Sequence, residues 1–221
     1  MMKYSRRKVH FIGIGGIGIS ALVRWYLADK WAVSGSDLSS SQITQDLEKR
    51  GARIHIGAHR ASWVPPSASL VIYSAAIKPD NPERKRARHL NILERSYAEA
   101  LNQLAAGYKV IAVSGAHGKS TTTAMAALML VRAGFDPTVI IGTKLREFKN
   151  TNFRKGESRW LLIEADEFHR SFLNYRPLAA ITTNIDREHL EYYKSFTNIK
   201  KAFTKFFSHV EPSGFLILNA E

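Results

Sequence analysis

Short apolar runs alternate with amphipathic stretches along the first half of the chain. We expect strands at residues 8–14, 31–37, 53–57 and 69–76. We expect helices at residues 17–29, 41–52, 82–89 and 97–105. This alternation is typical of βαβ units and predicts an α/β fold with a parallel sheet.

Gly107 interrupts the pattern, and a second α/β series follows it. We expect strands at residues 109–115, 137–142, 158–166, 177–186 and 214–221. We expect helices at 119–133 and 197–209, the latter burying Ile199, Phe203, Phe206 and Val210. The sequence therefore predicts one domain at 1–106 and another at 107–221. Because a hydrophobic strand at the end leaves a sheet edge that intact domains usually cover, we expect the chain to be a piece of a longer protein.

Composition limits the class of partner. Thirty-two Lys and Arg against nineteen Asp and Glu give a net charge of +13, which by itself favours nucleic acid or an anionic surface. Both halves share the excess, and a phosphate-rich small substrate explains it equally well, so we expect no nucleic acid partner. The chain has no cysteine and no apolar run of membrane-spanning length. We expect a soluble cytoplasmic protein without membrane insertion; its oligomeric state stays open.

The first candidate site is the glycine turn "GIGGIG" at residues 13–18, between a strand and a helix. Gly13 makes the tight turn, Gly15 lets a phosphate approach the backbone, and Gly18 lets helix and strand pack, with Gly16 between them. Asp37 follows at the end of the second strand. The pattern favours nucleotide or diphosphate binding, with NAD as the default ligand. The alternative is a turn that serves only helix–sheet packing.

The second candidate is the loop "GAHGKST", which also follows a strand and opens a helix. Backbone N–H groups of such a loop surround phosphates, Lys119 reaches the β and γ oxygens, and the Ser120 hydroxyl can bind Mg²⁺. Val113 stands where the longer Walker pattern has its first glycine, and the alternative is a chance turn. The sequence predicts ATP binding by Gly115, Ala116, His117, Gly118, Lys119, Ser120 and Thr121.

Acidic residues follow two later strands. "EADE" presents Glu164, Asp166 and Glu167, and "TTNIDREH" presents Asn184, Asp186, Glu188 and His189. Ligands of open α/β sheets bind at the carboxyl ends of strands, and Mg²⁺ is held there by carboxylates and phosphates. A solvated turn or a structural histidine remains the alternative reading for each group.

Several segments together resemble the Mur ligase family of peptidoglycan synthesis. They are "HFIGIGGIGISALV", "SGSD", "SAAIKPDNPE", "VSGAHGKSTTT", "EADEFHRSFL" and "TNIDREHLEYY". The resemblance extends over essentially the whole chain. The resemblance implies a Rossmann-like domain for a UDP-sugar followed by a P-loop-type ATPase domain. The family's third domain, which completes the amino-acid and nucleotide site, is not expected in this chain.

The resemblance also implies roles for particular residues. Lys119 and His117 would be catalytic, with Lys119 on the phosphates of ATP and His117 near the carboxylate of the UDP-sugar. Ser120 would hold one Mg²⁺, and Glu164 with His189 a second. The implied substrates are ATP, L-alanine and UDP-N-acetylmuramate, joined through an acyl phosphate. The UDP-sugar would meet Gly13, Gly15, Gly16, Gly18, Asp37 and Ser74.

Other readings remain open. Ala116 and Ser120 replace threonines more usual in the family's loop, and "EADEFHR" departs from the commoner acidic continuation, which leaves the roles of Asp166 and Glu167 undecided. A recycling ligase would add a tripeptide to the same UDP-sugar in place of alanine. A non-catalytic nucleotide-binding fragment is a further alternative. An NAD-dependent oxidoreductase is disfavoured by the second phosphate loop.

Overall fold

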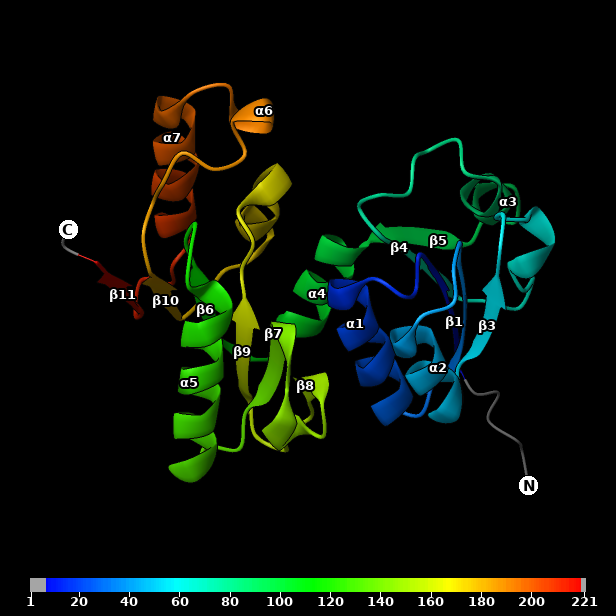
Figure 1. The fold of residues 1–221 in the computed structure, drawn as a ribbon, viewed down its shortest axis with the longest axis horizontal. Coiled ribbons are helices and arrows are strands. Elements are labelled where there is room, and N and C mark those ends of the chain that lie inside the picture. The colour runs from blue at the N-terminus through cyan, green and yellow to red at the C-terminus, as the bar shows by residue number, and fades with distance from the viewer. Residues whose placement is uncertain (1–6, 220–221) are drawn as a thin grey trace. The chain divides into compact units, whose positions relative to one another are not determined.

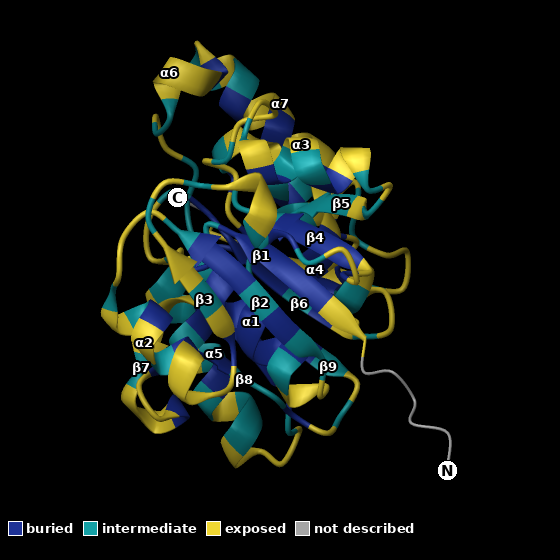
Figure 2. Cartoon of the chain, turned by 90° about the vertical axis from the view of Figure 1, so that its right-hand side faces the viewer, coloured by how far each residue is buried: buried dark blue, intermediate teal, exposed yellow. Residues whose placement is uncertain are grey.

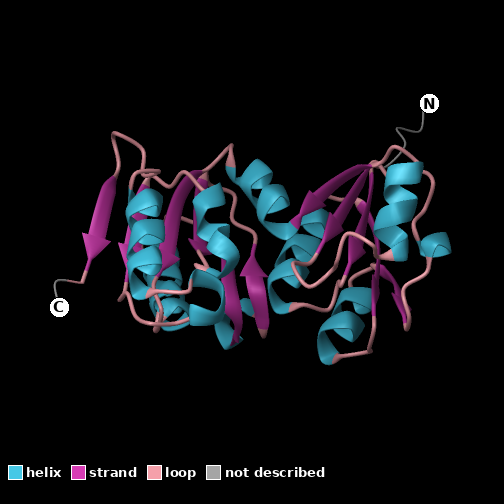
Figure 3. Cartoon of the chain, turned by 90° about the horizontal axis from the view of Figure 1, so that it is seen from above, coloured by secondary structure: helices cyan, strands magenta, loops and turns pink. Residues whose placement is uncertain are grey.

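The computed structural model describes residues 7–219, and its chain forms two compact units that divide between Leu101 and Asn102 (Figure 1). The division falls within helix α4 (Tyr97–Ala105), a few residues before the expected boundary at 106/107. Each unit has its own sheet and helices, which Figure 3 distinguishes by colour.

The first unit contains a five-stranded parallel sheet in the order β3-β2-β1-β4-β5. Its strands are β1 (Lys8–Ile12), β2 (Ala32–Asp37), β3 (Arg53–Ile56), β4 (Leu70–Tyr73) and β5 (Leu93–Ser96). Its helices are α1 (Ile17–Ala28), α2 (Gln42–Lys49), α3 (Pro82–His89) and the short η1 (Ala61–Trp63). The sequence did not predict β5, because "LERS" contains a single apolar residue.

The central strands β1 and β4 carry the core of this unit, and Figure 2 shows them in the colour of buried residues. Residues 9–12 of β1 and 70–72 of β4 are all buried, as expected for parallel strands covered on both faces. On α1, the residues Leu22, Val23 and Trp25 are almost fully buried. The strand order reverses at β1, so the carboxyl ends of β1 and β4 border the crevice where open α/β sheets bind ligands.

The second unit contains a six-stranded sheet in the order β11-β10-β6-β9-β7-β8. Its strands are β6 (Lys109–Ser114), β7 (Thr138–Leu145), β8 (Thr151–Arg154), β9 (Trp160–Glu164), β10 (Ala179–Thr182) and β11 (Phe215–Leu218). Its helices are α5 (Lys119–Arg132), α6 (Leu190–Tyr193), α7 (Phe196–Phe207), η2 (Arg146–Phe148) and η3 (Phe168–Asn174). The sheet is parallel except for β8, which pairs antiparallel with β7 and was not predicted.

Helix α5 packs on the second sheet, and helix α7 buries the predicted residues with one exception. Ala127 of α5 joins Val113, Val139 and Leu162 of the strands in one buried cluster. On α7, Ile199, Phe203 and Phe206 are buried, but Val210 lies beyond the end of the helix and is only half-buried.

Strand β11 lies at the edge of the second sheet beside β10 (Figure 1), and its four apolar side chains are all exposed, Phe215 by 57%. None of the helices formed by residues 7–219 combines the length and apolar character needed to cross a bilayer.

Candidate functional site

The loop between β6 and α5 depends on two glycines. Gly115 has φ +130°, and a Cβ there would lie 2.2 Å from the Thr183 hydroxyl, so no side chain fits. Gly118 has φ +79° and is the N-cap of α5. Among the described residues no side chain caps this helix end. Its first N–H groups and its positive dipole therefore face the loop, an arrangement suited to phosphate.

Residues that follow β10 hold this loop in shape. Asn184 accepts hydrogen bonds from the N–H of Ala116 at its main-chain oxygen (3.1 Å) and from the N–H of His117 at Oδ1 (2.9 Å). The carbonyl of His117 accepts from Asn184 Nδ2 (3.0 Å) and from the Thr183 hydroxyl (2.5 Å). From the sequence Asn184 was expected only as a polar residue at a strand end, and Thr183 was not expected at the site.

Lys119 is held on three sides. Its Nζ donates to the carbonyls of Gly115 (2.6 Å) and Ala116 (3.1 Å) and to the Glu167 carboxylate (2.9 Å). The two charged side chains are only 14% and 3% exposed, so this ion pair is largely shielded from water. Burial raises the pKa of the Glu167 carboxyl above its usual range, although the hydrogen bond from Lys119 acts in the opposite direction. The undecided Glu167 is therefore a direct partner of the loop lysine.

A buried tyrosine fixes the backbone of Glu167. The Tyr193 hydroxyl of α6 donates to the Glu167 carbonyl (2.5 Å), and burial, with a smaller effect of the Glu167 charge, raises the pKa of Tyr193 to about 12. The next residues of η3 include His169 and Arg170, both in the left-handed region at φ 52° and 58°. Non-glycine residues reach this region at an energetic cost, which often marks a functional segment.

Ser120 and Glu164 form an oxygen-rich pair beside the loop. The Ser120 hydroxyl donates to Glu164 Oε1 (3.0 Å), and the N–H of Gly142 holds Oε2 (2.7 Å). The strand β9 that ends in Glu164 neighbours β6, which explains how residues 44 positions apart meet. Hydroxyl and carboxylate oxygens are the ligands that Mg²⁺ prefers.

A second group that could hold a cation comprises Asp166, Glu167 and His189, whose ligand atoms lie within 4.8 Å of one another. The Phe168 ring lies 4.5 Å from the His189 ring. Within residues 7–219 this group does not include Glu164. The structure thus brings Glu164 to Ser120 and brings His189 to Asp166 and Glu167, whereas the family resemblance implied that Glu164 and His189 share a second Mg²⁺.

His117 extends from the loop toward acids of the segment between β10 and α6. Its Nδ1 lies 3.3 Å from Glu188 and its Nε2 lies 3.6 Å from Asp186. The imidazole is 60% exposed, so it is accessible to an incoming group.

The glycine turn of the first unit, residues 13–18, is held by hydrogen bonds to the end of strand β2. The N–H of Gly13 donates to the Ser36 carbonyl (2.9 Å), and the N–H of Gly15 donates to Asp37 Oδ2 (2.8 Å). A Cβ on Gly13 would lie 3.1 Å from the Ser74 Cβ. Gly16 is the N-cap of α1 and Gly18 lies in its first turn. Asp37 and Ser74 thus both border the turn, at the carboxyl ends of β2 and β4.

A buried polar network that sequence reasoning missed lies behind this turn. Glu83 of α3 accepts from His10 Nε2 (2.7 Å) at one oxygen, and from the Ser36 hydroxyl (2.7 Å) and His59 Nδ1 (2.6 Å) at the other. Glu83, His10 and Ser36 are fully buried. Burial alone would raise the pKa of Glu83, but the hydrogen bonds from His10, Ser36 and His59 outweigh it, so its pKa is lowered. The signal available in the sequence was a glutamate in the first turn of a capped helix.

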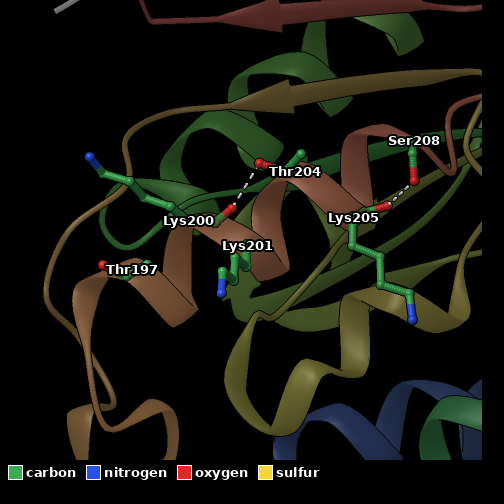
Figure 4. A pocket seen from close by; sticks show the side chains of 6 residues that line it. All are labelled: Thr197, Lys200, Lys201, Thr204, Lys205 and Ser208. Carbon is green, nitrogen blue, oxygen red and sulfur yellow. Dashed lines mark hydrogen bonds between the residues drawn. The ribbon is translucent and has the colours of Figure 1, made fainter.

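The basic face of α7 borders a shallow hollow of about 460 Å³ (Figure 4). Lys200, Lys201 and Lys205 extend in different directions there, and the hydroxyls of Thr204 and Ser208 bond to carbonyls of their own helix. These three lysines do not converge on one ligand. This face is best explained as a solvated helix surface.

Comparison with known proteins gives matches along almost the whole chain. Residues 8–109 match the model described as "Mur ligase family, catalytic domain", and residues 113–221 match "Mur ligase middle domain". The UDP-N-acetylmuramate–L-alanine ligase of Aquifex aeolicus is 44% identical over 221 residues, which are all of this chain and 48% of that protein. The chain therefore spans about half the length of the curated relatives it matches.

Solved structures agree with this result. A UDP-N-acetylmuramate-alanine ligase from Thermotoga maritima matches 97% of this chain and 49% of its own, with TM-score 0.86 and 32% identity. A Neisseria meningitides ligase named for UDP-N-acetylmuramate and L-alanyl-gamma-D-glutamyl-meso-diaminopimelate matches 98% of this chain and 72% of its own. Its TM-score is 0.89 and its identity 24%, so it supports the fold alone.

Proposed function

Because this chain belongs to the Mur ligase family, we propose that it carries the UDP-sugar- and ATP-phosphate-binding parts of an ATP-dependent ligase that joins L-alanine to UDP-N-acetylmuramate. The observation that carries the proposal is the loop from Gly115 to Ser120, which opens α5 and whose Gly115 and Ala116 carbonyls hold the Lys119 ammonium. The choice of substrates rests on the names of relatives 41–44% identical over nearly the whole chain.

The donor set fits ATP and Mg²⁺. The N–H groups at the start of α5 would bind phosphate oxygens, with Lys119 neutralising their charge. Ser120 and Glu164, whose oxygens are 3.0 Å apart, are suited to a Mg²⁺ shared with the phosphates. His189, together with its neighbouring carboxylates, is the candidate for a second Mg²⁺. When bound, these cations would neutralise the charge that develops during phosphoryl transfer.

The reaction we propose proceeds in two displacements. The carboxylate of the UDP-sugar attacks the γ-phosphorus of ATP, which forms an acyl phosphate and releases ADP. The amine of L-alanine then attacks the acyl carbon, and the amide forms as phosphate and a proton leave. Phosphoryl transfer mainly requires positioning and charge neutralisation from the protein, which Lys119 would supply here. The exposed imidazole of His117, in the loop between β6 and α5, would orient the attacking carboxylate of the UDP-sugar.

The first unit would bind the UDP-sugar. Its glycine turn, with Asp37 and Ser74 at the adjoining strand ends, would approach the diphosphate closely because Gly13, Gly15 and Gly16 carry no side chains. The Asp37 carboxylate already bonds to Gly15, so its proposed contribution is to shape the turn.

Calorimetric titration of this chain with Mg·ATP and with UDP-N-acetylmuramate tests the proposal. We expect both to bind, and we expect Lys119→Met to weaken ATP binding while leaving UDP-N-acetylmuramate binding unchanged. Phosphate release on adding L-alanine would then indicate ligation, and release only with the tripeptide would indicate the recycling reaction instead. Failure of Mg·ATP to bind the wild-type chain would refute the assignment.

A further inference from the structure

The Lys119 ammonium has no hydrogen left for a ligand in this structure. An ammonium group carries three N–H donors, and Lys119 directs them to Gly115, Ala116 and Glu167. A phosphate oxygen that bonds to Nζ must therefore displace or share at least one of these acceptors.

Glu167 is the acceptor that competes most strongly with a phosphate. It is the single charged partner of the three, and both of its oxygens lie within 3.2 Å of Nζ. Hydrogen bonds between ionised groups are roughly twice as strong as neutral ones, and this pair is shielded from water. The Tyr193 hydroxyl donates to the main-chain carbonyl of Glu167, and the Glu167 side chain is almost fully buried.

We propose that Glu167 tethers Lys119 in the ligand-free site, and that an incoming triphosphate binds by taking the ammonium group from this carboxylate. The inference rests on the proposed function, because the competing ligand is the phosphate chain of a nucleotide. Glu167 is then a positioning residue. Because its carboxylate competes with phosphate for the Lys119 ammonium, it makes the affinity for nucleotide weaker than the loop alone would give.

Two other roles for Glu167 predict different outcomes. A carboxylate that only supports Lys119 in its binding position would make affinity fall when it is removed. A carboxylate that binds Mg²⁺ would affect affinity only when the metal is present. The tether alone predicts that its removal strengthens metal-free nucleotide binding, and only while Lys119 is present.

The experiment is a double-mutant cycle on this chain, with ATP titrated calorimetrically in EDTA. We expect Glu167→Gln to bind ATP roughly tenfold more tightly than wild type, the effect of losing one charged hydrogen bond. In the Lys119→Met background the same change should alter affinity by less than about twofold. Glu167→Asp, which keeps the charge but withdraws it from Nζ, should also tighten binding. Glu157→Gln removes an exposed carboxylate of the same unit and corrects for net charge.

A second readout needs no nucleotide. Side-chain ¹H–¹⁵N spectra of the ligand-free chain should show a slowly exchanging Lys119 ammonium signal, identified by its loss in Lys119→Met and shifted or lost in Glu167→Gln. If the wild-type chain does not bind ATP, the proposed function fails while these spectra still decide on the tether. The inference would be overturned if Glu167→Gln bound ATP as weakly as wild type or more weakly, or if it tightened ATP binding equally in the Lys119→Met background. It would also be overturned if the Lys119 ammonium signal were unchanged in Glu167→Gln.

Discussion

Replacing Glu83 by alanine should strongly destabilise the first unit. The substitution removes the acceptor for His10, Ser36 and His59, of which His10 and Ser36 are fully buried and His59 is 11% exposed at its side chain. A buried donor without a partner costs about 1–3 kcal/mol. Glu83→Ala leaves His10 Nε2 without an acceptor, whereas the Ser36 hydroxyl still has His59 Nδ1 at 3.2 Å. Removal of a buried charge offsets part of this cost. We expect a loss of about 2 kcal/mol in the free energy of unfolding.

Amide hydrogen exchange at increasing urea concentrations measures this loss of stability in the first unit separately from the second. The amides of Val9 to Ile12 in β1 lie in the centre of the first sheet and report on that unit alone. Glu83→Gln keeps the shape and one carbonyl acceptor, and we expect it to lose about half as much. Glu48→Ala on the exposed face of α2 is the control and should change stability by about 0.5 kcal/mol at most. A Glu83→Ala variant as stable as this control would refute the reasoning.

Four further outcomes are expected. Because the pKa of Glu83 is lowered on folding, its contribution to stability is complete above the unfolded pKa of about 4.3 and is lost as the pH falls through the folded value. Urea unfolding between pH 3 and 6, about one to two units either side of the unfolded pKa, should therefore show the stability of the wild-type chain falling toward low pH, and the Glu83→Gln variant should lack this fall. Asn184→Ala removes two side-chain hydrogen bonds to His117, so Mg·ATP affinity should fall about tenfold and the His117 amide should exchange faster. Tyr193→Phe keeps the buried ring but loses the hydrogen bond to Glu167, and should lower the stability of the second unit by about 1 kcal/mol in urea unfolding. Ser120→Ala should reduce roughly tenfold the gain in ATP affinity that Mg²⁺ provides, as measured by titrations with and without the metal.

The sequence predicted those features that consecutive residues encode. Both glycine turns, their flanking strands and helices, and the polar strand ends were predicted because each is a local pattern of side-chain size and polarity. The strands β5 and β8 were not predicted, since "LERS" and "TNFR" have mostly polar residues. Each becomes a strand because it pairs with a neighbouring strand of the sheet.

The partners of the site residues could not be read in the same way. Lys119 and Glu167 are 48 positions apart, and His10 and Glu83 are 73 apart. Such pairs depend on the order of strands in the sheet, on the register between them and on the side of the sheet to which each loop turns. A periodic pattern specifies none of these, and the resemblance supplied roles for single residues without their contacts.

The four hydrogen bonds between the phosphate loop and the pair Thr183 and Asn184 have a consequence for how fast a nucleotide binds. A cradle already shaped by protein contacts loses little conformational entropy when it is filled. Association should therefore follow diffusional encounter, accelerated by the positive charge of the chain at low salt and slowed as salt is added, with no lag for ordering of the loop.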